Sequence, residues 1–73
     1  MFKKFYVVAV HEDRLVNAIR KLNEFNIEDV HLYELAGDNA GIWALGFKAS
    51  RKHFMNFLGV VRVERILLES NKD

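Results

Sequence analysis

The side chains of this chain that are best suited to chemistry are its three histidines, His11, His31 and His53. A neutral histidine can bind a metal ion or transfer a proton near neutral pH. In the arrangement of elements expected below, His31 and His53 lie near one end of a sheet, close to Glu28 and Asp29. Such a group would offer ligands to a metal ion. The spacing matches no metal-binding motif, so surface histidines are the favoured interpretation and we predict no metal site.

A second polar cluster, His11, Glu12 and Asp13, is expected at the opposite end of the sheet, together with Asp38 and Asn39. General acid–base catalysis needs a pocket and carboxyl groups whose pKa values are shifted by their surroundings. Nothing in the sequence implies such a pocket. The chain also shows no Ser-His-Asp order, phosphate-binding loop or other catalytic signature. We therefore predict a protein that is not an enzyme and binds no cofactor.

The segment "SRKHF" places Arg51 and Lys52 in the first turn of an expected helix. The helix dipole disfavours cations at this end, and local rules are most often broken at functional sites. Together with the free N–H groups of the helix start, these cations would attract phosphate or an acidic partner. The alternative is that both long side chains simply extend into solvent.

Two aromatic residues, Tyr6 and Trp43, lie in strand-like segments. RNA-binding domains with a four-stranded sheet stack bases on aromatic rings of this kind. The segment "AGIWALGFKA" contains the glycine and aromatic residues of that motif but not their order. The net charge of +1 also removes much of the electrostatic reason to expect nucleic acid. Core or dimer-interface positions are favoured for both rings, and RNA binding remains an alternative.

Length and composition indicate one globular domain that spans residues 1–73. A core of this size is thin, and the absence of cysteine excludes disulfides and thiolate metal sites. A partner subunit is then the leading way to bury more surface. No apolar run is long enough to span a membrane, and the run after Lys3 and Lys4 is too short for a signal peptide. We predict a cytoplasmic protein.

Apolar spacing predicts six elements. Residues 2–10, 28–36, 42–49 and 61–69 are expected to form strands, and residues 13–25 and 51–58 helices. The expected helix boundaries are Asp13 and Ser50 as N-caps, Asn26 as the first stop and Gly59 as the second. The sequence "GDNAG" is expected to connect the second and third strands as a hairpin.

This order of elements predicts an α+β, ferredoxin-like βαββαβ fold. Its antiparallel sheet has the strand order 4-1-3-2 and carries both helices on one face. A sheet with one face in water should alternate apolar and polar residues. The central strands, which contain "FYVVAV" and "GIWALGF", do not alternate. We therefore predict an apolar far face that binds something, although an apolar composition with some tolerated exposure is the alternative.

The topology resembles the ACT and PII-like regulatory families. The stretch "FKKFYVVAVHEDRLVNAIRKLNEFNIEDVHLYELAG" is similar to the first half of a PII-like chain, with its strand bearing lysines, helix, and second strand ending in glycine. The resemblance implies the fold and pairing of chains through the sheet. It implies no ligand, because the long loop of PII proteins is the short "GDNAG" here. The segment "HEDRLV" also lacks the glycine of the ACT turn.

We predict a small, free-standing regulatory protein that binds another protein. Examples would be an accessory regulator or a virus-encoded inhibitor. A homodimer is expected through the open sheet face or a sheet edge. The residues expected at this surface are Phe5, Tyr6, Tyr33, Trp43 and Leu67, with Arg51, Lys52 and Arg65 at its rim. The alternatives are an ACT-like sensor with a small ligand near His11 and Asp13, and binding of single-stranded RNA on the sheet.

Overall fold

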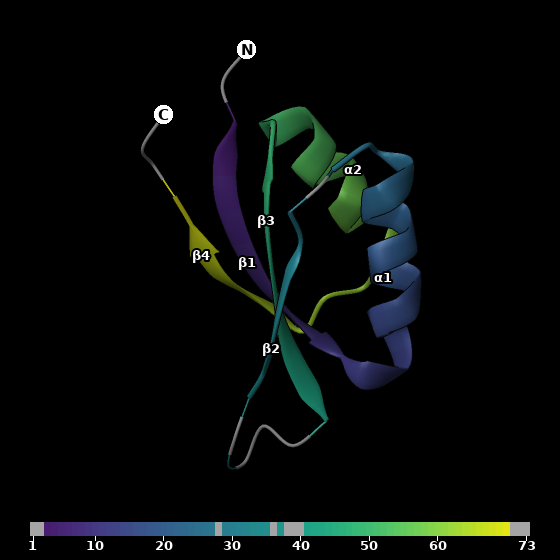
Figure 1. Cartoon of the computed structure of the whole chain (residues 1–73), viewed down its shortest axis with the longest axis vertical. Coiled ribbons are helices and arrows are strands. Elements are labelled where there is room, and N and C mark those ends of the chain that lie inside the picture. Colours follow the sequence, from purple (N-terminus) through teal and green to yellow (C-terminus); the bar gives the residue numbers. More distant parts are fainter. Residues whose placement is uncertain (1–2, 28, 36, 38–40, 71–73) are drawn as a thin grey trace.

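The computed structural model describes residues 3–27, 29–35, 37 and 41–70, and these form an α+β domain (Figure 1). The elements follow one another as β1 (Lys4–His11), α1 (Glu12–Glu24), β2 (His31–Glu34), β3 (Ile42–Ala49), α2 (Arg51–Val60) and β4 (Arg65–Glu69). The predicted class, element types and element order are therefore confirmed, while β2 and β4 are shorter than predicted. In the described part of the chain, no helix is long and apolar enough to cross a membrane.

The four strands form one sheet in the order β2-β3-β1-β4, and all neighbours are antiparallel. Counted from the β4 edge, the same row reads 4-1-3-2. The central strands β1 and β3 have eight residues each and pair without interruption from Lys4 opposite Ala49 to His11 opposite Ile42. The edge strands β2 and β4 have four and five residues. The two strands with unbroken apolar runs are therefore the central ones.

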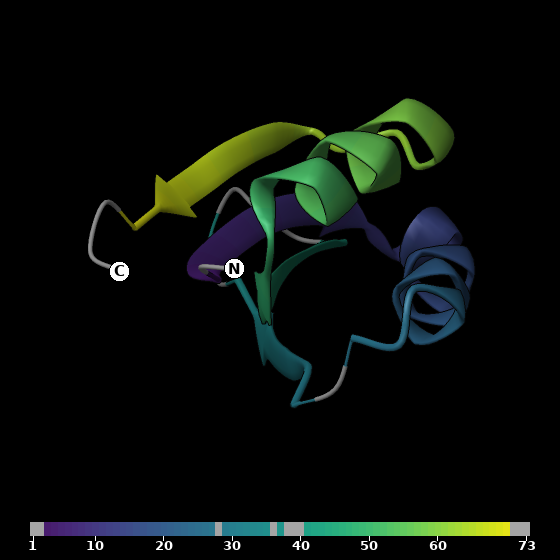
Figure 2. The ribbon, with the colours of Figure 1, turned by 90° about the horizontal axis from the view of Figure 1, so that it is seen from above.

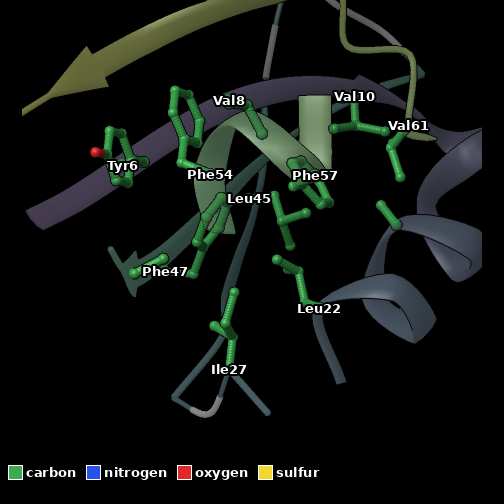
Figure 3. Close-up of a cluster of buried hydrophobic side chains, with 12 residues drawn as sticks. Tyr6, Val8, Val10, Leu22, Ile27, Leu45, Phe47, Phe54, Phe57 and Val61 are labelled. Carbon is green, nitrogen blue, oxygen red and sulfur yellow. The ribbon is translucent and has the colours of Figure 1, made fainter. Parts of the chain in front are cut away.

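Both helices lie on the same side of the sheet, which we call the helix side (Figures 1 and 2). The register places Tyr6, Val8 and Val10 of β1 on this side, opposite Phe47, Leu45 and Trp43 of β3. Figure 3 shows the core that fills the space between sheet and helices. It consists of Tyr6, Val8, Val10, Ala18, Leu22, Ile27, Leu45, Phe47, Ala49, Phe54, Phe57 and Val61.

The first helix begins one residue earlier than predicted, and its N-cap is His11 rather than Asp13. Since β1 runs directly into α1, the last residue of the strand occupies the cap position. Nδ1 of His11 accepts a hydrogen bond from the backbone N–H of Asp13 at 3.1 Å. Asn26, with a φ of 60°, follows the helix in the left-handed conformation that was predicted for its stop.

The second helix begins as predicted but ends later. Oγ of Ser50 accepts a hydrogen bond from the backbone N–H of His53 at 3.2 Å, which confirms the predicted cap. Gly59 does not end the helix, which continues through Val60. The chain becomes extended at Val61, whose side chain is buried in the core. Burial of Val61, rather than the flexibility of glycine, therefore determines where the chain leaves the helix.

Strand β4 contains a bulge, which changes the face that its side chains occupy. Ile66 pairs with Val8, but Leu68 pairs with the preceding residue of β1, Val7, so that Leu67 is an extra residue. Without a bulge, Ile66 and Leu68 would lie on one face, because side chains two residues apart in a regular strand point the same way; the alternation of the sequence predicts this, and the prediction is wrong. Ile66 shares the helix side with Val8, whereas Leu68 shares the opposite face with Val7.

Candidate functional site

The two helices cover the middle of the sheet and leave its edges uncovered. Their main contacts are with β1 and β3. Five of the eight exposed large apolar residues in the described chain belong to the short edge strands. They are Leu32 and Tyr33 on β2, and Ile66, Leu67 and Leu68 on β4. The edges are therefore the most apolar accessible surface of the molecule.

The face opposite the helices, which we call the open face, is built from alternate positions of all four strands. Its residues are Phe5, Val7, Ala9 and His11 of β1, Ile42, Ala44, Gly46 and Lys48 of β3, His31 and Tyr33 of β2, and Arg65 and Leu68 of β4. At its centre stand the small residues Ala9, Ala44 and Gly46. These leave room for larger side chains of neighbouring positions to lie across the sheet.

Phe5 uses this room. A Cβ atom placed on Gly46 would lie only 3.0 Å from Cζ of Phe5, so the end of the ring lies directly over the glycine. His31 pairs with the same glycine from the other side. The rings of Phe5 and His31 therefore adjoin one glycine on the open face.

A second aromatic contact extends this group along β2. The rings of His31 and Tyr33 lie 6.5 Å apart between centroids, with an angle of 16° between their planes. Both side chains are exposed, Tyr33 by 56%. We call Phe5, His31 and Tyr33 the aromatic patch of the open face.

The carboxylates of the paired strand positions lie on one side of the sheet only. Among the paired strand positions, the open face carries the cations Lys48 and Arg65 and no carboxylate. Glu34 pairs with Trp43, and Glu69 with Tyr6, so both carboxylates belong to the helix side. The open face is therefore more positive than the net charge of the chain indicates.

Two of the residues predicted at the binding surface lie elsewhere. Tyr6 is fully buried and stacks on Phe54, with ring centroids 3.8 Å apart. Trp43 is opposite Val10 and therefore on the helix side. Both belong to unbroken runs without charged residues, 5–10 in β1 and 42–47 in β3, and such runs do not reveal which alternate residues face outward.

The other predicted surface residues are accessible in the structure. Phe5 is half-buried and Tyr33 exposed, both on the open face, while Leu67 is exposed at the bulge of β4. Arg65 is exposed on the open face, and Lys52 is exposed on α2. His31 also belongs to this surface, although the prediction did not include it. The sequence could have indicated this position, because His31 lies two residues before Tyr33, and residues two apart in a strand share one face.

Arg51 has a structural role at the start of α2. Its Nη1 donates a hydrogen bond to Oε1 of Glu69 at 2.7 Å, which connects the first turn of the helix to the end of β4. The carboxylate offsets the unfavourable interaction of a cation with the helix N-terminus. The ion pair with Glu69 therefore accounts for Arg51 at the start of the helix without an external partner.

Beside this ion pair lies a buried hydroxyl. Oη of Tyr6 makes no hydrogen bond of good geometry with the described residues, although the guanidinium of Arg51 lies close enough to interact with it. Burial raises the pKa of Tyr6, and the negative charge of Glu69 raises it further, whereas the guanidinium of Arg51 lowers it in part. The neutral phenol is thus favoured in the folded chain.

Replacing Tyr6 by phenylalanine is expected to leave the free energy of unfolding at neutral pH unchanged, or to raise it by about 1 kcal/mol, because the lost hydroxyl makes no hydrogen bond of good geometry and interacts only weakly with Arg51. The raised pKa adds a pH effect. As the pH rises above 10.0, Tyr6 ionises first in the unfolded chain, so the free energy of unfolding falls. The variant should lose this part of the alkaline decrease. Urea unfolding of both chains at neutral and alkaline pH checks this, and a clear destabilisation at neutral pH would contradict it.

The histidines do not converge on a metal. His53 stacks on Phe25, with ring centroids 5.9 Å apart, while His31 belongs to the open face and His11 caps α1. Within the ranges that the structure describes, no group of three or more His, Asp or Glu side chains is arranged to hold a metal ion. The predicted neighbours Glu28, Asp38 and Asn39 lie outside the described residues.

A hollow of about 610 Å³ lies where α1 ends and α2 begins. Its lining mixes the cationic or titratable side chains Lys3, Lys48 and His53 with the carboxylates Glu24 and Asp29. With both signs of charge around it, the hollow favours no particular class of ligand.

Comparison with known proteins adds no family to this description. No family model, curated protein or solved structure matches the chain. Its function must therefore be argued from the surfaces described above.

Proposed function

We propose that this chain is a small, ferredoxin-like regulatory protein without catalytic activity, which binds other proteins, beginning with a second copy of itself, through the edge of β4. The observation that carries the proposal is a run of three large apolar residues on that edge. Ile66, Leu67 and Leu68 are 45%, 40% and 47% exposed. We call these three residues the β4 ridge.

The energetics of a short chain favour covering this ridge. Complete burial of one Leu or Ile side chain contributes roughly 1.5–3 kcal/mol. A domain of 73 residues buries only a modest share of its surface, so the chain gains proportionally more from a partner than a large protein does. Exposed apolar surface on a small protein commonly marks a binding site, and these three residues lie around one edge of the sheet, with Ile66 on the helix side and Leu68 on the open face.

The bulge indicates how a partner would bind. A regular edge strand can accept another strand through its free backbone groups, but a bulge twists the edge and interrupts that pairing. In β4 the extra residue, Leu67, sits in the middle of the ridge. We therefore propose that the ridge is covered by side-chain packing, with Arg65 and Glu69 at its two ends as polar contacts.

The topology adds support from outside the ridge. The element order and the row of strands, 4-1-3-2 from the β4 edge, fit a ferredoxin-like domain. The ACT and PII-like families, which the first half of the chain resembles, associate through their sheets. Of the properties of these families, we propose only association through the sheet for the present chain.

The proposal is tested by solution mass across a dilution series. The wild-type chain should have twice the mass of one chain at high concentration and dissociate on dilution. A Leu67→Ser, Leu68→Ser double variant should remain a monomer throughout. Val16→Ser, which changes a 68% exposed residue on α1, should behave like the wild type. A wild-type monomer at every concentration would overturn self-association through the ridge.

A further inference from the structure

We infer that the open face binds single-stranded nucleic acid by stacking bases on the aromatic patch. This goes beyond the proposed function and uses a different part of the molecule. The patch lies over β1, β3 and β2, whereas the β4 ridge lies at the opposite edge of the sheet. Association through the ridge would leave the patch accessible.

The first argument is the position of the rings. The end of the Phe5 ring lies over Gly46, where a side chain would be only 3.0 Å away, so one side of the ring lies against the sheet. His31 and Tyr33 continue the group along β2 with nearly parallel planes, 16° apart. Exposed rings on a sheet are suitable for base stacking, because every base has a flat π-face.

The second argument is charge. Lys48 lies on the open face opposite Phe5, so a cation lies at one end of the patch. None of the paired strand positions of this face carries a carboxylate. A net charge of +1 disfavours nucleic-acid binding only if the charges are evenly distributed over the surface. On the open face they are not.

The third argument separates nucleic acid from an acidic protein partner. Protein interfaces anchor on large side chains that enter well-packed pockets. The centre of the open face has the small residues Ala9, Ala44 and Gly46, all of which are already buried by their neighbours. Such a surface offers a platform to a flat group rather than a pocket to a side chain. The phosphates of an extended strand would then lie near Lys48.

Fluorescence anisotropy with a labelled single-stranded oligo(dT) or oligo(U) tests the inference. Binding should be detectable at low salt. One phosphate contact, at Lys48, predicts a slope of log K against log salt concentration of about −0.7. Tyr33→Ala should weaken binding about tenfold, in the range expected for one lost stacking contact. Lys48→Glu should weaken it and make the slope shallower.

The controls use variants that retain the fold but change other surfaces. Arg20→Glu, on an exposed position of α1 on the helix side, makes the same change of charge as Lys48→Glu and should not alter binding. An Ile66→Ser, Leu67→Ser variant, which changes the β4 ridge but leaves Leu68 of the open face in place, should bind as the wild type does, which separates this inference from the proposed function. Absence of binding at low salt would overturn the inference. Equal loss with Arg20→Glu, or no loss with Tyr33→Ala, would overturn it too, because the chain would then attract any polyanion.

Discussion

Replacement of Phe54 by alanine is expected to remove a large part of the stability of this domain. The Phe54 ring is almost completely buried and stacks on Tyr6 at 3.8 Å, with Phe47 6.2 Å away (Figure 3). Replacing a buried Phe by Ala costs about 3–5 kcal/mol, because the cavity closes only in part. A chain of 73 residues has a total stability of about 4–11 kcal/mol. The variant should therefore unfold at a much lower urea concentration than the wild type.

Met55 provides the matched control, since it follows Phe54 in the same helix but is 51% exposed. Met55→Ala should change the free energy of unfolding by no more than about 0.5 kcal/mol, as exposed positions usually do. Urea unfolding followed by circular dichroism and by the fluorescence of Trp43 compares the variants. Similar urea midpoints for Phe54→Ala and Met55→Ala would contradict the role given to the stack.

Two substitutions of glycine by alanine are expected to have opposite effects. Gly41 has a φ of +81°, and a Cβ there would lie 3.2 Å from Oε1 of Glu12. The carbonyl of Gly41 also accepts a hydrogen bond from the backbone N–H of Glu12 at 2.8 Å, which holds the start of α1 against the start of β3. The left-handed conformation costs an L-residue about 1–2 kcal/mol, so Gly41→Ala should destabilise the domain by at least that amount.

Gly59 lies inside α2, and a Cβ at this position would meet no atom within 4 Å. Gly59→Ala should stabilise the domain by about 0.5–1 kcal/mol, since alanine is the better helix former. A third variant, Gly41→Asn, should fall between Gly41→Ala and the wild type, because asparagine tolerates positive φ. Thermal unfolding of the three variants beside the wild type measures the order. A loss of stability with Gly59→Ala would contradict this account of α2.

Much of the fold could be predicted from apolar spacing and caps. The interval of the apolar residues in α1 and the Ser50 cap of α2 identify both helices before the structure is known. The unbroken apolar runs correctly indicate that β1 and β3 are central. These features depend on neighbours in the sequence, and local preferences of this kind are visible in a single chain.

The predictions that failed depend on contacts between distant segments. The bulge of β4 depends on its pairing with β1, and the residues next to Leu67 in the sequence do not indicate a bulge. The partner of Arg51 is Glu69, which is eighteen residues away, so the cation at the helix start seemed unexplained. The outward residues of β1 could not be chosen because all its central positions are apolar. Of the residues predicted at a binding surface, Phe5 and Tyr33 therefore lie on the open face, whereas Tyr6 is buried and Trp43 lies on the helix side.

Strand β4 is attached more weakly than the rest of the domain, so its local unfolding should need less free energy. The strand forms its ladder with β1 alone, its side chains lie largely outside the core, and its end is held by the ion pair of Glu69 with Arg51. Local opening of an element needs only the free energy of the contacts that it loses. Strand β4 should therefore detach while β1, β3 and both helices remain folded. In that opened state, the uncovered edge of β1 becomes a place where the β4 of another molecule can insert, and two chains can exchange their last strands.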